Sequence, residues 1–144
     1  AYNDEKHVES AINSVLNQSF TDIELICVND CSSDNTLEVM QKYGNKDSRV
    51  KVVSSEKNSG VFYARYLGIK EAKGEYLMLL DSDDTLEVNA CEVVYNQAKD
   101  QGADYVVFCV KHFIDENVKD YKLIETEEFT GTSHDCITFE VYEK

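Results

Sequence analysis

The chain has 144 residues, a length typical of one domain with an apolar core of its own. Its formal net charge is −14 at neutral pH, which argues against nucleic-acid binding because that binding depends on Lys and Arg to neutralise phosphates. No apolar run reaches the length of a membrane-spanning helix. Beside so many carboxylates, a phosphorylated ligand would need a divalent cation or a local Arg.

Helices and strands are expected to alternate along the first 110 residues. An apolar stripe from Val8 to Leu16 marks the first helix, which Asn3 or Asp4 can cap. Residues 76–80 are all apolar, which is typical of a strand buried on both faces of a parallel sheet. In chain order we expect a helix over 3–18, a strand over 23–28, a helix ending at Gly44, a strand over 50–53, a helix over 61–72, a strand over 76–80, a helix over about 86–100 and a strand over 105–110.

This alternation predicts an α/β fold with a doubly wound, mostly parallel sheet. We assign residues 1–110 to a ligand-binding α/β domain. The pattern ends near Lys111, so residues 111–144 are interpreted as a tail or the start of a further region.

Five cysteines, odd in number and scattered in spacing, form no zinc or redox motif. We interpret them as structural thiols of a reducing compartment, which indicates a cytoplasmic protein. They are Cys27, Cys31, Cys91, Cys109 and Cys136.

Three polar clusters are expected at the carboxyl ends of strands, the edge at which open α/β sheets bind ligands. One of them opens the helix that carries Arg65. The clusters are Asn29-Asp30, Asn58-Ser59-Gly60 and Asp81-Ser82-Asp83-Asp84.

The acidic cluster has two interpretations. Three carboxylates within four residues repel one another unless a cation lies among them, and Mg²⁺ or Mn²⁺ commonly bridges such carboxylates to substrate phosphates. Alternatively, Asp83 or Asp84 caps the following helix, where the helix dipole favours acids. Asp30 can likewise accept a hydrogen bond from a ligand or merely form a turn. Arg65 can lie near a phosphate or make an exposed ion pair, which is usually weak.

Together these motifs resemble glycosyltransferase family 2, which has the GT-A fold. The resemblance covers roughly residues 1–110, with Cys31 in place of the usual Gly and Tyr66 in place of the usual Asn. The matching motifs are Tyr2-Asn3, Ser14-Val15-Leu16-Asn17-Gln18, Asn29-Asp30-Cys31-Ser32-Ser33-Asp34, Asn58-Ser59-Gly60 with Ala64-Arg65 and Gly68, and Asp81-Ser82-Asp83-Asp84.

The resemblance implies a site for a nucleotide-sugar donor of the UDP type, with Mn²⁺ or Mg²⁺ as cofactor. Asp30 would hydrogen-bond the uracil, and Arg65 would lie near the base or the diphosphate. The remaining donor-site residues would be Tyr2, Asn3, Asn58 and Ser82, with Asp81 near the ribose and the metal and Asp83 as the main metal ligand.

The implied reaction transfers a sugar, with inversion, to a hydroxyl of a carbohydrate or lipid-linked acceptor in cell-surface polysaccharide biosynthesis. Such an enzyme would be cytoplasmic, with peripheral contact to the membrane as an option. Asp135 is the candidate general base, since no Glu-Asp pair follows Asp84. We expect the family's first strand to precede Ala1 and most of the acceptor half to be missing, so the chain would be part of a longer protein.

Three alternatives stay open at this point. Residues 81–85 also fit the motif of haloacid-dehalogenase-like phosphatases, in which Asp81 would be the nucleophile. A calcium-binding EF-hand loop is a weaker fit, because Leu86 stands where the turn needs Gly. The chain could also bind a nucleotide without catalysing transfer.

Overall fold

The computed structural model describes residues 1–104, 106, 110–111 and 141–143. Within these residues, no helix is both long enough and apolar enough to cross a membrane. The cysteines of the described part, Cys27, Cys31 and Cys91, are free thiols, while Cys109 and Cys136 lie outside it.

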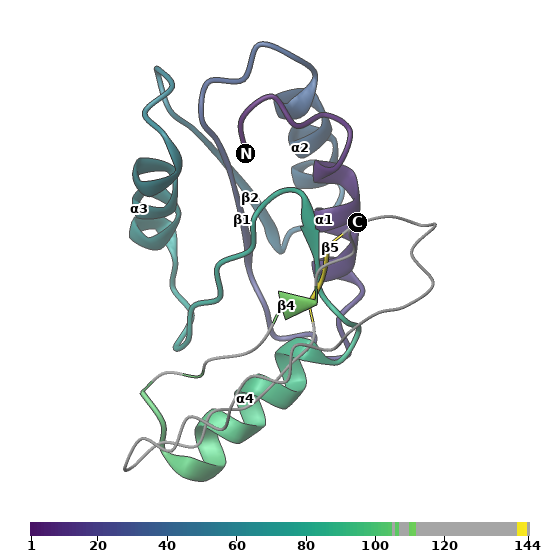
Figure 1. The fold of residues 1–144 in the computed structure, drawn as a ribbon, viewed down its shortest axis with the longest axis vertical. Helices are drawn as coiled ribbons and strands as arrows, with labels where there is room; N and C mark the ends of the chain where they lie inside the picture. The colour runs from purple at the N-terminus through teal and green to yellow at the C-terminus, as the bar shows by residue number, and fades with distance from the viewer. Residues whose placement is uncertain (105, 107–109, 112–140, 144) are drawn as a thin grey trace.

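Two parallel strands, β1 (Leu25–Asn29) and β2 (Val50–Ser54), pair residue for residue along their length. Helices α1 (Val8–Leu16) and α2 (Thr36–Gly44) lie on one side of this pair, and α3 (Val61–Glu71) lies on the other (Figure 1). The alternation expected from the sequence is thus present as an α/β arrangement with parallel strands.

The apolar core lies between the β1–β2 pair and helices α1 and α2. Burial raises the pKa of the Cys27 thiol to about 11, so this side chain stays protonated and packs as a small apolar group. Leu16, Leu25 and Val52 pack against the core from its margin. The buried residues of this cluster are Val8, Ile12, Cys27, Met40 and Val50.

The first helix starts later than expected. His7 is the N-cap of α1, so the prediction that Asn3 or Asp4 caps it is wrong. The amide of Asp4 donates to the hydroxyl of Thr36 over 2.8 Å, and its carbonyl accepts hydrogen bonds from the first turn of α1. The start of the chain is therefore bound to the start of α2 instead of continuing α1.

The apolar segment of residues 76–80 is not a strand, so that prediction is wrong. Tyr76, Leu77 and Leu79 are 37%, 56% and 52% exposed. A strand requires hydrogen-bonding neighbours, and none of the described strands pairs with this segment. Three of its five apolar side chains are consequently exposed to solvent, while Met78 and Leu80 are half-buried.

A second, smaller sheet has the strand order β3-β5-β4. Strand β3 (Asp84–Thr85) runs antiparallel to β5 (Val141–Glu143), and β4 (Val110–Lys111) runs parallel to β5. The expected strand over 105–110 is described at residues 106 and 110 alone, and at residue 110 it is part of β4.

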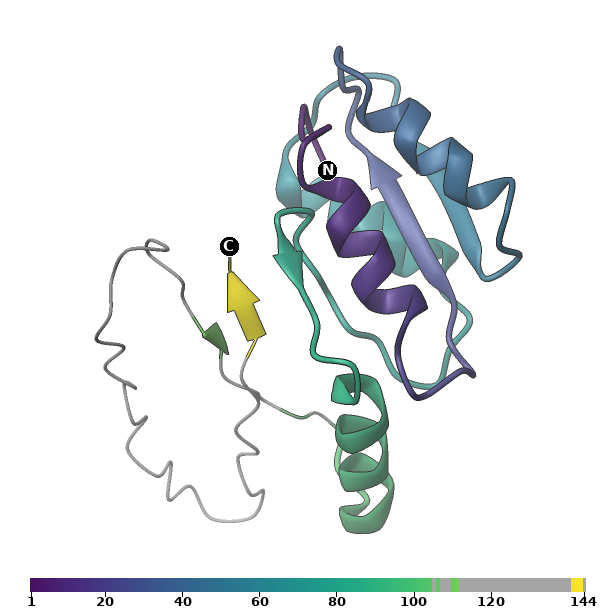
Figure 2. The ribbon, with the colours of Figure 1, turned by 90° about the vertical axis from the view of Figure 1, so that its right-hand side faces the viewer.

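Helix α4 (Ala90–Gln101) begins a turn later than expected and extends away from the β1–β2 pair (Figure 2). Gly102 ends it in the left-handed conformation, φ 63°, which favours glycine. The division of the chain at residues 110 and 111 into two parts stays a prediction.

Candidate functional site

Asp30 is the most strongly bound side chain at the carboxyl end of β1. It is 3% exposed, and both of its carboxylate oxygens accept hydrogen bonds. Oδ1 accepts from the Ser55 hydroxyl at 2.7 Å and the Ser59 amide at 3.0 Å, while Oδ2 accepts from the Gly60 amide at 2.7 Å. These hydrogen bonds therefore connect the start of α3 to the end of β1.

The charge of Asp30 is stabilised by this arrangement. Burial alone would raise its pKa, but the hydrogen bonds from Ser55, Ser59 and Gly60 outweigh burial, so the pKa lies below its ordinary value. The amides at a helix N-terminus also favour an anion. Gly60 has φ 84° and ψ 169°, a conformation that only glycine adopts at low cost, so its amide can face Asp30.

Arg65 forms an ion pair with Asp81, which comes from a distant part of the chain. One guanidinium nitrogen, Nη2, lies 2.8 Å from Oδ1 and 3.1 Å from Oδ2 of Asp81. The two side chains are 38% and 52% exposed, so the pair adds little stability. The buried Nε of Arg65 has no hydrogen-bond partner among the described residues.

Ala1 shows that Asp30 and Asp81 lie on the same side of the molecule. Its amino group donates to Val28 O at 2.6 Å, and its carbonyl accepts from the Asp30 amide at 2.9 Å. Burial lowers the pKa of this amino group, whereas Cys27, Asp30, Asp4 and Asp81 act on it in the opposite direction. The amide of Asp30 thus contacts Ala1, and the charge of Asp81 is close enough to act on the amino group of Ala1.

Asn3 and Tyr2 continue from Ala1 along this edge. Asn3 has a left-handed backbone, φ 51°, and its side-chain Oδ1 accepts from the amide and hydroxyl of Ser33 at 2.8 and 3.2 Å. Asn3 therefore holds the turn after β1, a structural role that the sequence did not indicate. Tyr2 is 50% exposed, so its ring is open to a ligand.

The acidic residues form a turn of their own. The Asp84 amide donates to the Asp81 carbonyl at 3.2 Å, and Asp84 begins β3. The N-cap of α4 is Asn89, so the alternative that Asp83 or Asp84 caps this helix is wrong. Asp83 and Asn58 are exposed and Ser82 is half-buried.

A metal ion would find hard oxygen donors in this turn. The described residues contain no group of three or more His, Cys, Asp or Glu side chains that could enclose a metal. The other common arrangement, in which one or two carboxylates share Mg²⁺ or Mn²⁺ with the phosphates of a substrate, needs no more than the two carboxylates Asp81 and Asp83, of which Asp81 here pairs with Arg65. The EF-hand alternative needs several converging carboxylates, and the described residues contain no such group.

The sequence did not indicate that the side chains of Gln18 and Ser14 hold the segment that follows the acidic turn. The Gln18 side chain is 4% exposed, donates to Glu87 O at 2.7 Å and accepts from the Cys91 amide at 2.9 Å. The Ser14 hydroxyl accepts from the Leu86 amide at 3.1 Å. Both residues belong to a motif quoted above, but their partners lie about 70 residues away and no local pattern identifies them.

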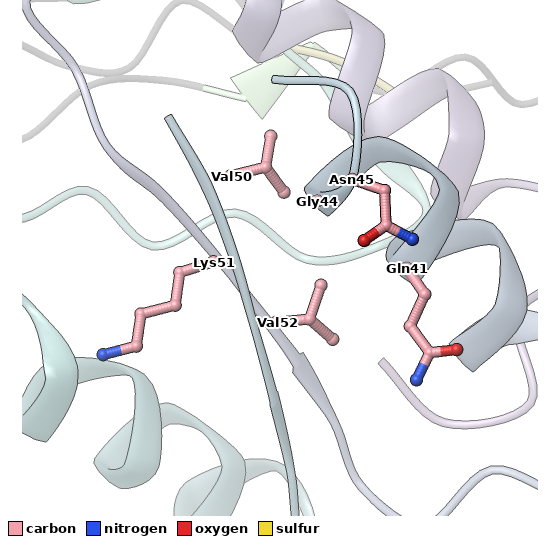
Figure 3. Close-up of a pocket in the computed structure, with 6 residues that line it drawn as sticks. All are labelled: Gln41, Gly44, Asn45, Val50, Lys51 and Val52. Atoms are coloured by element: carbon pink, nitrogen blue, oxygen red, sulfur yellow. The ribbon is translucent and has the colours of Figure 1, made fainter. Parts of the chain in front are cut away.

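A hollow of about 320 Å³ lies elsewhere, at the amino-terminal half of β2 (Figure 3). Val50 and Val52 face α2 there, while Lys51 points to the other side of the strand, where it pairs with Glu71. This hollow is at the opposite end of the strands from Asp30, and none of the predicted site residues lines it. The residues around it are Gln41, Gly44, Asn45, Val50, Lys51 and Val52.

The structure thus brings Tyr2, Asn3, Asp30, Arg65 and Asp81 to one edge of the sheet. Ser82 and Asp83 follow Asp81 in the acidic turn, and Asn58 lies in the loop next to Ser59. The candidate base Asp135 lies outside the described residues.

Comparison with known proteins identifies the family of this chain. The family described as Glycosyl transferase family 2 matches residues 1–141. The chain is 37% identical over 106 residues to glycosyltransferase GlyG of Streptococcus pneumoniae, which covers 74% of this chain and 35% of that protein. It is 35% identical over 146 residues to a cholesterol galactosyltransferase of Borreliella burgdorferi, covering 98% of this chain and 40% of that protein.

Solved structures agree with this assignment. The crystal structure of Staphylococcus aureus TarS in complex with UDP-GlcNAc superimposes with a TM-score of 0.75 at 32% identity. The match covers 83% of this chain and 35% of the TarS chain. The chain therefore spans about a third to two fifths of the length of these relatives. Its fold is that of the GT-A glycosyltransferases, and it belongs to glycosyl transferase family 2.

Proposed function

We propose that this chain is the donor-binding part of a glycosyltransferase that takes a sugar from a UDP-sugar. The observation that carries the proposal is the arrangement of Asp30 and the Arg65–Asp81 pair at one edge of the sheet. TarS, which shares this fold, has been crystallised with UDP and with UDP-GlcNAc. The family match over residues 1–141 favours this function over the phosphatase alternative.

Each site residue has a chemical part in this proposal. Asp30 would accept from an N–H of the uracil in addition to the hydrogen bonds it already accepts, and Tyr2 would lie beside the nucleoside. Arg65, which here pairs with Asp81, would lie near the diphosphate. Asp81 and Asp83 would hold Mn²⁺ or Mg²⁺, which supplies Lewis-acid stabilisation of the leaving diphosphate.

The transfer itself would proceed with inversion. An acceptor hydroxyl loses its proton to a carboxylate base, for which Asp135 is the candidate, and attacks the anomeric carbon as the bond to the diphosphate breaks. The acceptor is a carbohydrate or lipid-linked hydroxyl, since the relatives include enzymes named for poly(ribitol-phosphate) and cholesterol. We place the reaction in the cytoplasm, with peripheral membrane contact, where free thiols such as Cys27 persist.

Calorimetry with UDP in the presence and absence of Mn²⁺ tests the donor site. We expect the protein to bind UDP in a metal-dependent manner and Asp83→Ala to lose this binding, because the substitution removes a ligand that bridges the metal to the phosphates. Asp100→Ala is the matched control, since Asp100 is an exposed carboxylate at the far end of α4 and should leave binding unchanged. Equal binding by the protein and by Asp83→Ala would overturn the metal assignment.

A further inference from the structure

The end of helix α1 is bound to the segment that follows the acidic turn, and the donor site described so far makes no use of this contact. The Gln18 side chain donates to Glu87 O at 2.7 Å and accepts from the Cys91 amide at 2.9 Å. The Ser14 hydroxyl accepts from the Leu86 amide at 3.1 Å. Ser14 and Gln18 belong to one of the motifs that resemble glycosyltransferase family 2, yet neither is among the proposed donor-site residues.

Both side chains are oriented for these contacts by their own helix. The Ser14 hydroxyl donates to the Ala11 carbonyl at 2.8 Å, so its oxygen presents a lone pair to the Leu86 amide. The Gln18 side-chain nitrogen also donates to the Ser14 carbonyl at 3.0 Å. Gln18 is 4% exposed, so solvent has little access to its side chain. The contact between α1 and the segment after the acidic turn therefore has a defined geometry.

This contact lies close to the acidic turn along the chain. Asp84 and Thr85 form β3, which follows Asp83 directly and leads into Leu86. Strand β3 also lies beside α1 (Figure 2). An extended segment of two residues has little slack, so the place at which Leu86 is held limits where Asp83 can lie.

The charges of the acidic turn do little to hold it in place. Asp81 and Asp83 are exposed, and carboxylates so near in the chain repel one another. The ion pair of Asp81 with Arg65 is also exposed, and such pairs contribute little. The position of the turn therefore depends on how the segment that follows it is held.

Helix α1 also packs against the strand that leads to Asp30. Val8 and Ile12 of α1 belong to the same core cluster as Cys27 of β1, which lies three residues before Asp30. One helix is thus connected to both ends of the proposed donor site, through the core to Asp30 and through hydrogen bonds to the acidic turn. A ligand that uses both ends binds well only if their spacing is right.

We propose that Ser14 and Gln18 are positioning residues of the donor site. Through the backbone of Leu86 and Glu87 they set where the acidic turn lies relative to Asp30, and so how well the diphosphate and its metal ion are bound. Neither side chain would touch the ligand. This inference rests on the proposed function and adds to it the part of the fold that fixes the distance between the uracil and diphosphate ends of the site.

Binding of uridine and of UDP to the same variants tests this proposal. Uridine would contact the Asp30 end alone, whereas UDP with Mn²⁺ would also use the acidic turn. We expect Ser14→Ala to weaken Mn²⁺-dependent UDP binding, measured by calorimetry, about tenfold, a loss typical of residues that orient a metal site from behind its ligands. Uridine binding, measured by NMR titration, should stay unchanged. Gln18→Ala should show the same difference between the two ligands.

Two control variants separate positioning from a general loss of stability. Ser10→Ala makes the same change at an exposed residue one turn earlier in α1, and it should bind both ligands as the unchanged protein does. Val52→Ala weakens the packing of β2 against the core, far from Ser14. It should lower the free energy of unfolding without weakening UDP binding more than uridine binding.

The outcomes also keep this proposal apart from the donor site itself. Equal UDP binding by Ser14→Ala and Ser10→Ala would overturn the positioning role, and so would equal losses of uridine and UDP binding in Ser14→Ala. In both cases the unchanged protein would still bind UDP with Mn²⁺, and the proposed function would stand. If the unchanged protein failed to bind UDP, the proposed function would be wrong and this inference would fall with it.

Discussion

Cys31 adopts a left-handed backbone conformation, φ 60°, in the turn that follows β1. A residue with a Cβ pays about 1–2 kcal/mol for this conformation. Replacing it with Gly removes that cost but adds about 0.4–1 kcal/mol of conformational entropy to the unfolded chain. We expect Cys31→Gly to stabilise the protein by up to about 1 kcal/mol, measured by urea unfolding. Cys31→Ala keeps the Cβ and should give no such gain; equal stability of the two variants would contradict the argument.

Asp47 should control part of the acid sensitivity of the fold. Hydrogen bonds from the side chain and amide of Arg49 lower its pKa to about 2. Because this pKa is below that of the unfolded chain, the stabilisation is present above about pH 4 and is lost as the pH falls towards 2.

The substitution Asp47→Asn should therefore lower stability at neutral pH and flatten the loss of stability between about pH 4 and pH 2. Urea midpoints across this pH range measure both effects. Asp100→Asn, which changes an exposed carboxylate with no ion pair in the described part, is the control. If the stability of Asp47→Asn fell as steeply with falling pH as that of the unchanged protein, other carboxylates would be responsible for the acid sensitivity.

Among the secondary-structure elements, the buried side-chain amide of Gln18, which follows α1, connects this helix to the segment that leads into α4. Gln18→Ala would leave Glu87 O and the Cys91 amide without the partner they now have. A fully buried polar group left unsatisfied costs about 1–3 kcal/mol, and because these two hydrogen bonds are only partly buried we expect a loss of about 1–2 kcal/mol in urea unfolding. Gln41→Ala removes an exposed amide from α2 and should change little. A loss as small as that of the control would mean that water replaces both contacts.

Local patterns in the sequence were sufficient for much of the fold. The apolar stripe of α1, the strands β1 and β2, and the glycine that ends α4 are each encoded within a few residues, and their predictions are confirmed within a residue or two except where α1 and α4 begin. Residues 76–80 differ because a strand forms only if other parts of the chain pair with it. Their composition indicated burial, but composition carries no information on a pairing partner.

The same distinction applies to the candidate site. The sequence placed Asp30 at the carboxyl end of a strand and Arg65 in the helix that follows the next strand, and the structure has both there, while their part in binding a ligand stays a prediction. The partners of these residues, Ser55 and Asp81, follow from how distant segments meet, so no spacing in the sequence predicted them. Whether Asp83 or Asp84 caps the following helix could also be decided only from the structure, which shows Asn89 in the cap position.

For the molecule as a whole, the dominant electrostatic feature is its net charge of −14. The ion pairs of the described part are mostly exposed, and such pairs contribute little, so repulsion among the excess carboxylates should prevail. We expect the melting temperature to rise as NaCl is increased from roughly 0.01 M to 0.1 M, where the Debye length falls from about 30 to 10 Å. Differential scanning calorimetry measures this directly, and a falling melting temperature would show that the ion pairs dominate.

In the proposed donor site, the hydrogen bonds that join Asp30 to the start of α3 bear on which pyrimidine could be accepted. The carboxylate must stay ionised to hold the amides of Ser59 and Gly60, so it can only accept hydrogen bonds and never donate one. The imide of uracil brings a hydrogen to such a group, whereas the ring nitrogen of cytosine brings a lone pair. A preference for uridine over cytidine would then be a by-product of the attachment of a helix to a strand.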